Sequence, residues 1–258
     1  MSLNPPIRDW RGLRVWVIGA SSGIGAALGE ALLSRGARVA FSARREAQLT
    51  ALATKGGSQA LALPFDVTDA PAVPVALDRI IASWGGVDLV VFAAGTHQPV
   101  RAWELDVATA RYLLEINLHG VLNCLPPVIA RLLTQRSGAV AVISSVAGYR
   151  GLPTALVYGA GKAALNNLAE TLYLDLAPKG IGVYLVCPGF VKTPLTDQNT
   201  FRMPSLISAP AAAEAIIAGF ERGDFEIHFP KRFTGVLKML RLLPYRWYFP
   251  LIRRITGL

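Results

Sequence analysis

The chain has 258 residues, of which 52% are hydrophobic and 17% are charged. This composition excludes a disordered protein and is ample for the core of one α/β domain. The formal net charge of +9 would suit a nucleic acid, a membrane surface or an anionic ligand, but seven of the cations lie after Glu226, where no acidic residue follows.

Nothing in the sequence indicates secretion or membrane insertion. Cys124 and Cys187 are far apart and lack disulfide-like or metal-like spacing, and residues 1–12 hold no apolar leader. No stretch reaches the roughly 18 uninterrupted apolar residues of a spanning helix. We therefore expect a cytoplasmic protein, with contact at the inner face of a membrane left open.

The hydrophobic pattern alternates between strands and helices along most of the chain. Residues 14–18 form an apolar β-branched run, and the Ala-rich residues 24–35 then predict a helix. Further strands are predicted at 38–42, 61–65, 89–93, 139–144, 182–186 and 225–229, and further helices at 46–55, 72–84, 107–133, 155–176 and 211–222. Continuous apolar strands imply a sheet that is covered on both faces.

This alternation predicts the fold class and the domain organisation. We expect an α/β fold of the Rossmann type, a doubly wound, seven-stranded parallel sheet with helices on both faces. Residues 1–230 would form this single catalytic domain, and residues 231–258 a basic, apolar C-terminal tail.

A glycine-rich turn joins the first strand to the first helix and suits a pyrophosphate. Glycine permits the tight turn and the close approach of backbone, and the helix N-terminus supplies amide donors and a positive dipole. The alternative is an ordinary turn. The residues predicted to bind phosphate are Gly19, Ser21, Ser22, Gly23, Ile24 and Gly25.

The end of the second strand indicates which cofactor binds. An acidic residue there would hold a ribose 2′-hydroxyl, but Ala43 takes its place and Arg44 and Arg45 follow. Guanidinium groups suit a 2′-phosphate, which favours NADP(H) over NAD(H), unless both arginines merely begin a solvated helix. After the third strand, Asp66 and Val67 are expected beside the adenine, where Asp66 would also suit a helix cap.

Tyr158 and Lys162 lie four residues apart on a predicted helix and therefore share one face. A lysine ammonium, together with an oxidised nicotinamide, would favour the phenolate of an otherwise weakly acidic tyrosine. Tyr158 would then exchange a proton with an alcohol or a carbonyl. Alone such a pair arises by chance, but Ser144 and Ser145 end a strand at the sheet edge where ligands bind.

Over about residues 12–230 the chain resembles the short-chain dehydrogenase/reductase family in its compact single-domain form. The resemblance rests on residues in the family's order and at family-like separation: Gly19, Gly23, Ile24, Gly25, Asp66, Asn117, Ser145, Tyr158, Lys162, Pro188, Gly189 and Thr193.

The resemblance implies a role for each residue of the site. Ser145 would hydrogen-bond the substrate oxygen, with Ser144 structural, and Tyr158 would be the acid/base. Lys162 would bind the nicotinamide ribose and lower the tyrosine pKa, and Asn117 would hold a water that relays protons, unless it only kinks its helix.

The nicotinamide carboxamide would be positioned by Val191 and Thr193, after the turn at Pro188 and Gly189. In the motif that ends the fourth strand, the family's usual asparagine is replaced in the run Phe92, Ala93, Ala94, Gly95. Ala94 and Gly95 would still let the backbone approach the adenine ribose. The family also implies a homodimer or homotetramer.

The three histidines, His97, His119 and His228, have no partner at ligand spacing, so we expect surface or packing roles and no metal site. Residues 194–210 would form a lid over the substrate, with Met203, Leu206 and Ile207 facing inward or packing on the core.

The tail interleaves apolar residues with cations, and Pro244 and Pro250 are expected to cut it into short helices. Such a segment favours an anionic bilayer surface, or else it covers the substrate cleft or a subunit interface. Nucleic acid is not expected, because the tail is too apolar and no binding module is recognisable.

Together these features predict an NADP(H)-dependent oxidoreductase that reduces a ketone or aldehyde, or oxidises the alcohol, on a lipophilic small molecule. The alternatives are an NAD-linked alcohol or steroid dehydrogenase, and a nucleotide-binding scaffold without turnover. The set Asn117, Ser145, Tyr158 and Lys162 argues against the scaffold, which has no physical need for it.

Overall fold

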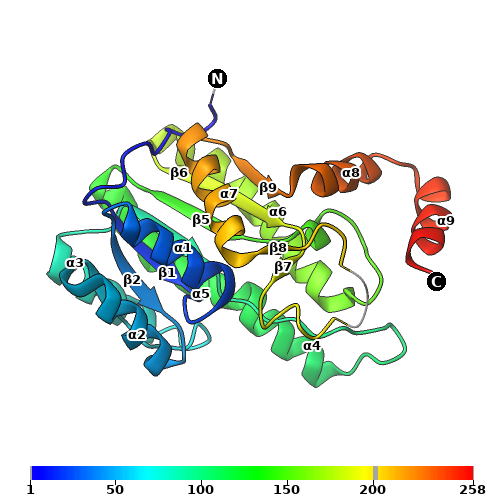
Figure 1. Cartoon of the computed structure of the whole chain (residues 1–258), viewed down its shortest axis with the longest axis horizontal. Helices are drawn as coiled ribbons and strands as arrows, with labels where there is room; N and C mark the ends of the chain where they lie inside the picture. Colours follow the sequence, from blue (N-terminus) through cyan, green and yellow to red (C-terminus); the bar gives the residue numbers. More distant parts are fainter. Residues whose placement is uncertain (1, 200–202, 258) are drawn as a thin grey trace.

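The structure is a computed structural model that describes residues 2–199 and 203–257. A seven-stranded parallel sheet in the order β3-β2-β1-β4-β5-β6-β9 forms its centre (Figure 1). The strands are β1 (Arg14–Ile18), β2 (Arg38–Ser42), β3 (Ala60–Ala62), β4 (Leu89–Phe92), β5 (Ala139–Ile143), β6 (Gly182–Pro188) and β9 (Glu226–Phe229). The predicted fold class is confirmed.

Helices cover the sheet on both faces. They are α1 (Gly23–Ser34), α2 (Glu46–Gly56), α3 (Ala72–Trp84), α4 (Val107–Leu114), α5 (Gly120–Gln135), α6 (Leu156–Leu176) and α7 (Ala209–Arg222). Alternate strand residues serve two cores: Val15 and Val17 pack with α1, α2 and α7, whereas Trp16 and Ile18 pack with α3, α5 and α6. This double burial explains why the strands lack polar alternation.

Three elements differ from the sequence-based prediction. The third strand is shorter, because only Ala60–Ala62 pairs with β2. The helix predicted at 107–133 is interrupted by π-helical residues Glu115–His119, which include Asn117. Two short strands that were not predicted, β7 (Val191–Lys192) and β8 (Ile207–Ser208), pair at the base of the proposed lid.

The tail forms two helices, α8 (Lys231–Arg241) and α9 (Tyr245–Thr256), which extend beyond β9 (Figure 1). Pro244 separates them, as predicted, but Pro250 lies inside α9 and does not end it. Pro250 has no N–H to bond the backbone carbonyl of Arg246. Both residues are exposed, so this carbonyl can bond water instead.

The helical stretch Val107–Gln135 would be long and apolar enough to cross a membrane by length and composition alone. It contains the buried Asn117, however, and its residues Val121, Cys124 and Val128 pack in the core beside the sheet. It is therefore explained as a core helix.

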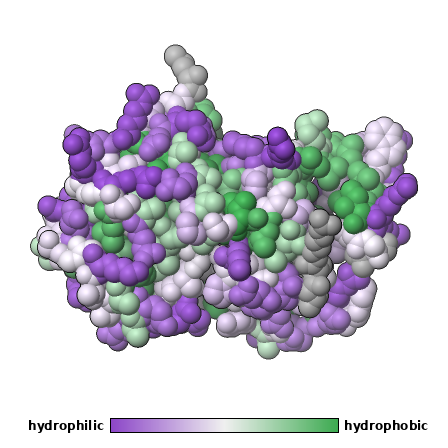
Figure 2. All heavy atoms as spheres, in the orientation of Figure 1, coloured by the Kyte–Doolittle hydropathy of each residue, from purple (hydrophilic) through white to green (hydrophobic). Residues whose placement is uncertain are grey.

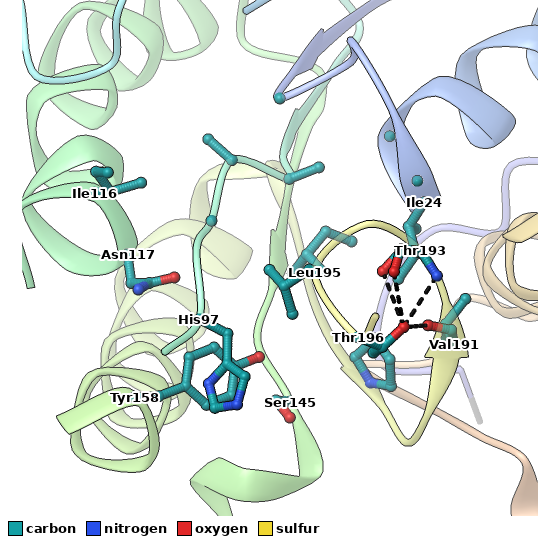
Figure 3. A pocket seen from close by; sticks show the side chains of 18 of the residues that line it. Ile24, His97, Ile116, Asn117, Ser145, Tyr158, Val191, Thr193, Leu195 and Thr196 are labelled. Carbon is teal, nitrogen blue, oxygen red and sulfur yellow. Dashed lines mark hydrogen bonds between the residues drawn. The ribbon is translucent and has the colours of Figure 1, made fainter. Parts of the chain in front are cut away.

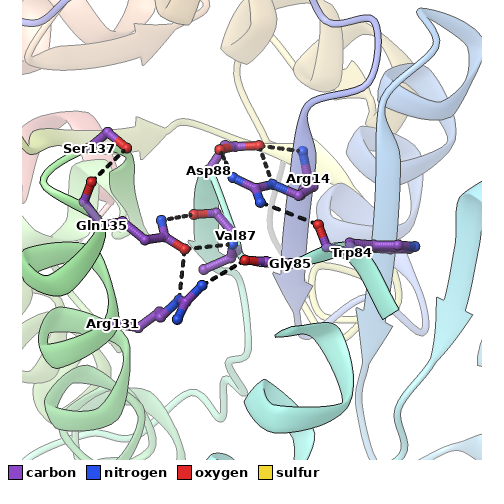
Figure 4. A network of polar contacts seen from close by, with 8 residues as sticks. All are labelled: Arg14, Trp84, Gly85, Val87, Asp88, Arg131, Gln135 and Ser137. Carbon is purple, nitrogen blue, oxygen red and sulfur yellow. Dashed lines mark hydrogen bonds and ion pairs between the residues drawn. The ribbon is translucent and has the colours of Figure 1, made fainter. Parts of the chain in front are cut away.

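An ion pair ties β1 to β4 at the amino edge of the sheet (Figure 4). The Asp88 carboxylate accepts hydrogen bonds from the Arg14 backbone N–H and guanidinium, each at 2.8 Å. Beside it, the Gln135 side chain bonds both backbone groups of Val87 at 3.1 and 2.8 Å. These contacts fix where the strands begin, opposite the edge that carries the site.

Replacing Asp88 by asparagine should lower the free energy of unfolding by about 2 kcal/mol at neutral pH, because it removes charged hydrogen bonds that are three-quarters buried. Burial opposes ionisation, but the Arg14 contacts prevail and lower the Asp88 pKa. The pair therefore stabilises the folded protein fully above the pKa that Asp88 has in the unfolded chain. This stabilisation is lost as the pH falls through the lower pKa of Asp88 in the folded protein. Urea unfolding from neutral pH to pH 3 would check this.

The exposed Asp78, also changed to asparagine, provides the control and should leave stability unchanged within about 0.5 kcal/mol. An Asp88→Asn protein as stable as the wild type at neutral pH would contradict the prediction.

Candidate active site

A cleft of about 480 Å³ opens at the carboxyl edge of the sheet, where β1 and β4 lie side by side and the strand order reverses. This is the place where open α/β sheets bind ligands. Every residue that the sequence predicts to be catalytic or cofactor-binding lines this cleft.

The glycine-rich turn is shaped by tight backbone packing. Gly19 has φ of +98°, and a Cβ there would collide with the backbone of Ala94 after β4. A Cβ at Gly25 would likewise collide with the Gly19 carbonyl. The first turn of α1 has no acidic residue, and the Ser22 side chain does not cap it. Its amide groups are therefore left for an anionic ligand such as a pyrophosphate.

The two arginines after β2 differ in their contacts. The Arg45 guanidinium donates to the Ser21 hydroxyl at 2.8 Å and to the Ser22 hydroxyl at 2.6 Å. Arg44 instead lies 3.8 Å from the Asp66 carboxylate, and its side chain is 63% exposed. Arg45 and the two serines thus form one cluster of donors beside the glycine-rich turn.

The residues after β3 and β4 form the opposite wall of the cleft. The Asp66 carboxylate accepts from the Thr68 backbone N–H at 3.0 Å, so it caps the turn before α3 and also lines the cleft. Asn117 donates to the Leu113 and Thr96 carbonyls at 2.8 and 2.9 Å and accepts from the Thr96 N–H at 3.1 Å. The π-helical turn therefore holds the loop after β4.

Gly95 lies where this loop meets the site. A Cβ at Gly95 would come within 3.0 Å of the Asn117 amide oxygen and 3.7 Å of Lys162 Nζ. This position tolerates no side chain without movement of the polar groups below it. The family's usual asparagine is missing from this loop after β4. Asn117, which bonds the backbone of Thr96, holds the loop in place instead.

Ser145, which follows β5, and Tyr158 on α6 lie close together in the cleft (Figure 3). Lys162, one turn further along α6, lines the same cleft. The Ser145 hydroxyl accepts from the Ala147 N–H at 3.1 Å, which orients it at the end of β5. Lys162 is 4% exposed, and its Nζ donates to the Ile143 carbonyl at 3.0 Å and lies 5.7 Å from the Tyr158 ring centroid. Ser144 donates to the Lys162 carbonyl at 2.9 Å, a structural contact.

Burial favours the neutral form of both ionisable side chains, Tyr158 and Lys162. It raises the pKa of the Tyr158 phenol, while the neighbouring Ser145 hydroxyl acts in the opposite direction. It lowers the pKa of Lys162 to about 8. At neutral pH the phenol is therefore protonated and the lysine is mostly charged.

His97 packs against Tyr158, and it also lies in the cleft, a place that the sequence did not indicate. Its ring lines the cleft, with its centroid 4.7 Å from that of Tyr158 (Figure 3), and its Nδ1 is buried and has no hydrogen-bond partner among the described residues. Burial lowers the His97 pKa, although Asn199 acts in the opposite direction, so the imidazole is neutral at neutral pH. The other two histidines bond Glu115 and Thr234 outside the cleft.

The lid segment contributes other residues than the sequence predicted. The described lining residues there are Pro194, Leu195, Thr196 and Asn199. Leu206 is exposed and Ile207 packs on the core through β8, and neither they nor Met203 line the cleft. Residues 200–202 of this predicted lid lie outside the described residues.

Thr196 anchors the start of this segment. Its hydroxyl donates to the Val191 carbonyl at 2.7 Å and accepts from the Thr193 N–H at 3.0 Å, so it stabilises the turn after β7 (Figure 3). No motif in the sequence indicated this role, because it depends on a local turn.

Comparison with known proteins agrees with this geometry. The family model for short chain dehydrogenase matches residues 14–203. The chain belongs to the short-chain dehydrogenase family. Like other members, it is an oxidoreductase that takes a nicotinamide cofactor, and the resemblance inferred from its motifs is confirmed.

Two relatives and one solved structure illustrate the similarity. An uncharacterised oxidoreductase of Myxococcus xanthus is 36% identical over 93% of this chain and 96% of its own length. The 3-oxoacyl-(acyl-carrier-protein) reductase FabG of Escherichia coli is 32% identical over 73% of this chain and 77% of its own.

The structure of a Burkholderia phymatum short-chain dehydrogenase in complex with NAD superposes with a TM-score of 0.82 at 23% identity. The superposition covers 90% of this chain and 94% of the Burkholderia chain, which shows that the two share a fold.

Proposed function

We propose that this short-chain dehydrogenase uses NADPH to reduce a ketone or aldehyde on an uncharged, apolar small molecule. The observation that carries the proposal is that Tyr158, the Ser145 hydroxyl and the buried Lys162 lie together in the cleft, with Lys162 Nζ 5.7 Å from the Tyr158 ring centroid. A protonated phenol is a proton donor, which reduction of a carbonyl requires.

A bound nicotinamide cofactor would supply the hydride for this reduction. The Ser145 hydroxyl would donate a hydrogen bond to the substrate carbonyl oxygen and stabilise the charge that develops there. Tyr158 would donate its proton to that oxygen, and the charged Lys162 would stabilise the phenolate that remains. Asn117 would act by holding the loop after β4 against Lys162, in addition to the proton relay that the family implies.

The preference for NADPH is supported by the cluster of Arg45, Ser21 and Ser22. This cluster offers one guanidinium and two hydroxyls. Asp66 is the only acidic residue among the described residues of the cleft, and it lies beside Arg44. Such a set fits a ribose 2′-phosphate. The glycine-rich turn would hold the pyrophosphate and Val191 and Thr193 the carboxamide.

Replacing Arg45 by glutamine should raise the Kd for NADPH by about 10- to 100-fold, because charged hydrogen bonds to the phosphate are lost. The Kd for NADH should change little, since NADH has no 2′-phosphate. Titration of cofactor fluorescence would measure both constants.

Arg44→Gln should weaken NADPH binding less, because this guanidinium is more exposed and faces Asp66. Equal weakening of NADH and NADPH by Arg45→Gln would contradict the assignment and favour the NAD-linked dehydrogenase as the alternative function.

The substrate class is inferred from the lining of the cleft around Tyr158. The described residues there are apolar or neutral, including Leu152, Pro153, Leu195 and Asn199, and the neutral His97 offers one further hydrogen bond. No described cation other than the buried Lys162 lies at this end to bind a carboxylate. A neutral, lipophilic carbonyl compound fits this lining.

The test is NADPH oxidation with a series of neutral ketones and aldehydes of increasing chain length, each compared with the keto acid of equal length. Neutral compounds should react with a kcat/KM that rises with chain length, and the keto acids should react at least tenfold more slowly. Turnover limited to keto acids, or to alcohols with NAD, would overturn the proposal. No turnover with any compound, despite cofactor binding, would favour a scaffold.

A further inference from the structure

The tail helices α8 and α9 carry an apolar surface that the rest of the chain leaves uncovered. Figure 2 shows hydrophobic side chains gathered along these two helices at one end of the molecule. We call the exposed apolar residues and the exposed cations of the tail together the tail surface. Its apolar residues are Val236, Met239, Leu242, Tyr245, Trp247, Phe249 and Ile255. Trp247 is 57% and Met239 68% exposed, and exposed apolar side chains that gather in one place mark an interaction surface.

The same surface carries only positive charge. Its exposed cations are Lys231, Arg232, Arg241, Arg246, Arg253 and Arg254. None of them forms an ion pair within the part of the chain that the structure describes. The nearest acid in sequence, Glu226, is already bound by Lys238 at 2.6 Å and by the Tyr149 hydroxyl. The cations are thus available to an external anion.

On α9 the two kinds of side chain occupy different sides. The spacing along the helix places Arg246, Arg253 and Arg254 on the side opposite the buried Tyr248 and Ile252. Trp247 and Phe249 flank the boundary between the sides, where an interfacial helix places its aromatic rings. Because the side with Tyr248 and Ile252 packs on the protein, the outer side of α9 presents the three arginines, flanked by the exposed rings of Trp247 and Phe249.

The tail is held firmly although most of it is exposed. The Arg150 guanidinium donates to the Leu240 and Leu243 carbonyls at 2.9 and 2.6 Å, at the end of α8. It also lies 3.9 Å from the Tyr248 ring centroid, and the Tyr248 hydroxyl donates to the Gly151 carbonyl at 2.7 Å. Contacts of this kind present the surface in a fixed orientation.

The surface lies next to the cleft without entering it. α8 begins directly after β9, at the carboxyl edge of the sheet, and the Phe233 ring packs 5.6 Å from that of Phe190, which lines the cleft. Arg150 and Gly151 belong to the loop between Ser145 and Tyr158. No tail residue that the structure describes lines the cleft, which argues against the tail as its cover.

We propose that the tail surface binds an anionic phospholipid bilayer, with its aromatic and aliphatic side chains among the lipid head groups and its cations on the lipid phosphates. Charge complementarity favours this occupant over a second copy of the chain. In a symmetric contact between two copies the tail cations would face each other and repel. The proposal places the active-site cleft beside the lipid surface and is independent of the identity of the substrate.

The experiment is co-sedimentation of the full-length protein with vesicles of phosphatidylcholine containing 30% phosphatidylglycerol, and with vesicles of phosphatidylcholine alone. Binding should require phosphatidylglycerol and should weaken when NaCl rises from 0.1 to 0.5 M. The part of the tryptophan fluorescence that is lost in Trp247→Phe, one of five tryptophans in the chain, should shift to the blue on binding. Equal sedimentation with both vesicle types, or with neither, would overturn the proposal.

Two sets of variants test which residues carry the binding. Arg246→Glu, Arg253→Glu and Arg254→Glu combined should weaken partition by about a hundredfold or more, at about 1 kcal/mol for each cation. The control combines Arg8→Glu, Arg38→Glu and Arg79→Glu, exposed residues of the body with the same change in net charge. It should retain most of the binding, because charges beyond about 10 Å are screened.

The apolar half is tested by Trp247→Ser with Phe249→Ser, compared with Trp103→Ser, an exposed aromatic residue elsewhere. Only the tail variant should weaken partition by about tenfold or more. Unchanged binding by both tail variants would refute the assignment. The assignment would also be refuted if the wild type formed a dimer and did not bind vesicles, and the tail variants were monomers. The tail surface would then join two copies of the chain. Unaltered thermal unfolding would establish that each variant is folded.

Discussion

Changing Tyr158 to phenylalanine should lower kcat for carbonyl reduction by about 10²- to 10⁴-fold, the range for loss of a general acid. The change removes only the hydroxyl that would donate the proton, and leaves the ring packed against His97. Because no hydrogen bond described in the structure joins that hydroxyl to the glycine-rich turn or to Arg45, the Kd for NADPH should change by less than about threefold. Single-turnover oxidation of bound NADPH, together with cofactor titration, separates the two effects.

Tyr112→Phe is the matched control, since this tyrosine is exposed on α4 and lies outside the cleft. It should retain full activity. A Tyr158→Phe protein that turns over at the wild-type rate would refute the assignment of the proton donor, whatever its substrate.

Changing Lys162 to methionine should remove most activity and at the same time stabilise the protein at neutral pH. Activity should fall by about 10²-fold, because the positive charge beside the phenol is lost. Stability should rise by about 1 to 3 kcal/mol, because a charged lysine that is 4% exposed no longer has to be buried, less the lost hydrogen bond to Ile143.

The pH dependence gives this second prediction a definite sign. Burial lowers the Lys162 pKa from 10.5 to about 8, so the unfolded chain binds more protons than the folded chain between these values. Wild-type stability therefore rises with pH over this interval, and the advantage of Lys162→Met should shrink above pH 8. Denaturant unfolding at pH 7 and pH 9.5 would measure it.

The exposed Lys179, also changed to methionine, should alter neither stability nor activity. A Lys162→Met protein that is less stable than the wild type at neutral pH would contradict the prediction, and would mean that the hydrogen bond to Ile143 outweighs the cost of burying the charge.

The sheet and its site could be predicted from sequence because each signal is local. Apolar strands such as Arg14–Ile18, the glycine-rich turn and the spacing of Tyr158 and Lys162 leave their pattern within a few residues. In a parallel sheet the loops at the carboxyl edges of neighbouring strands then meet by topology alone. The predicted site residues accordingly line one cleft.

The features that the sequence did not reveal depend on contacts between distant segments. His97 has no motif, and its place beside Tyr158 follows from the path of the loop after β4, which Asn117 fixes from another helix. The π-helical turn at Asn117 likewise replaces regular helix geometry because its side chain bonds Thr96 as well as Leu113. Helix α9 continues through Pro250, where the sequence predicted a break, because this proline is exposed.

Arg150 has a consequence for regulation that follows from thermodynamics. It connects the last turn of α8 to the loop between Ser145 and Tyr158. The hydrogen bonds of Arg150 therefore contribute both to the free energy of ordering the tail and to that of ordering the loop. Any ligand of the tail that strengthens substrate binding through Arg150 must itself be bound more tightly, by the same factor, when substrate is present. The two ends of this contact form a reciprocal pair, and a cycle of Arg150→Lys measured with and without each ligand would give their coupling free energy.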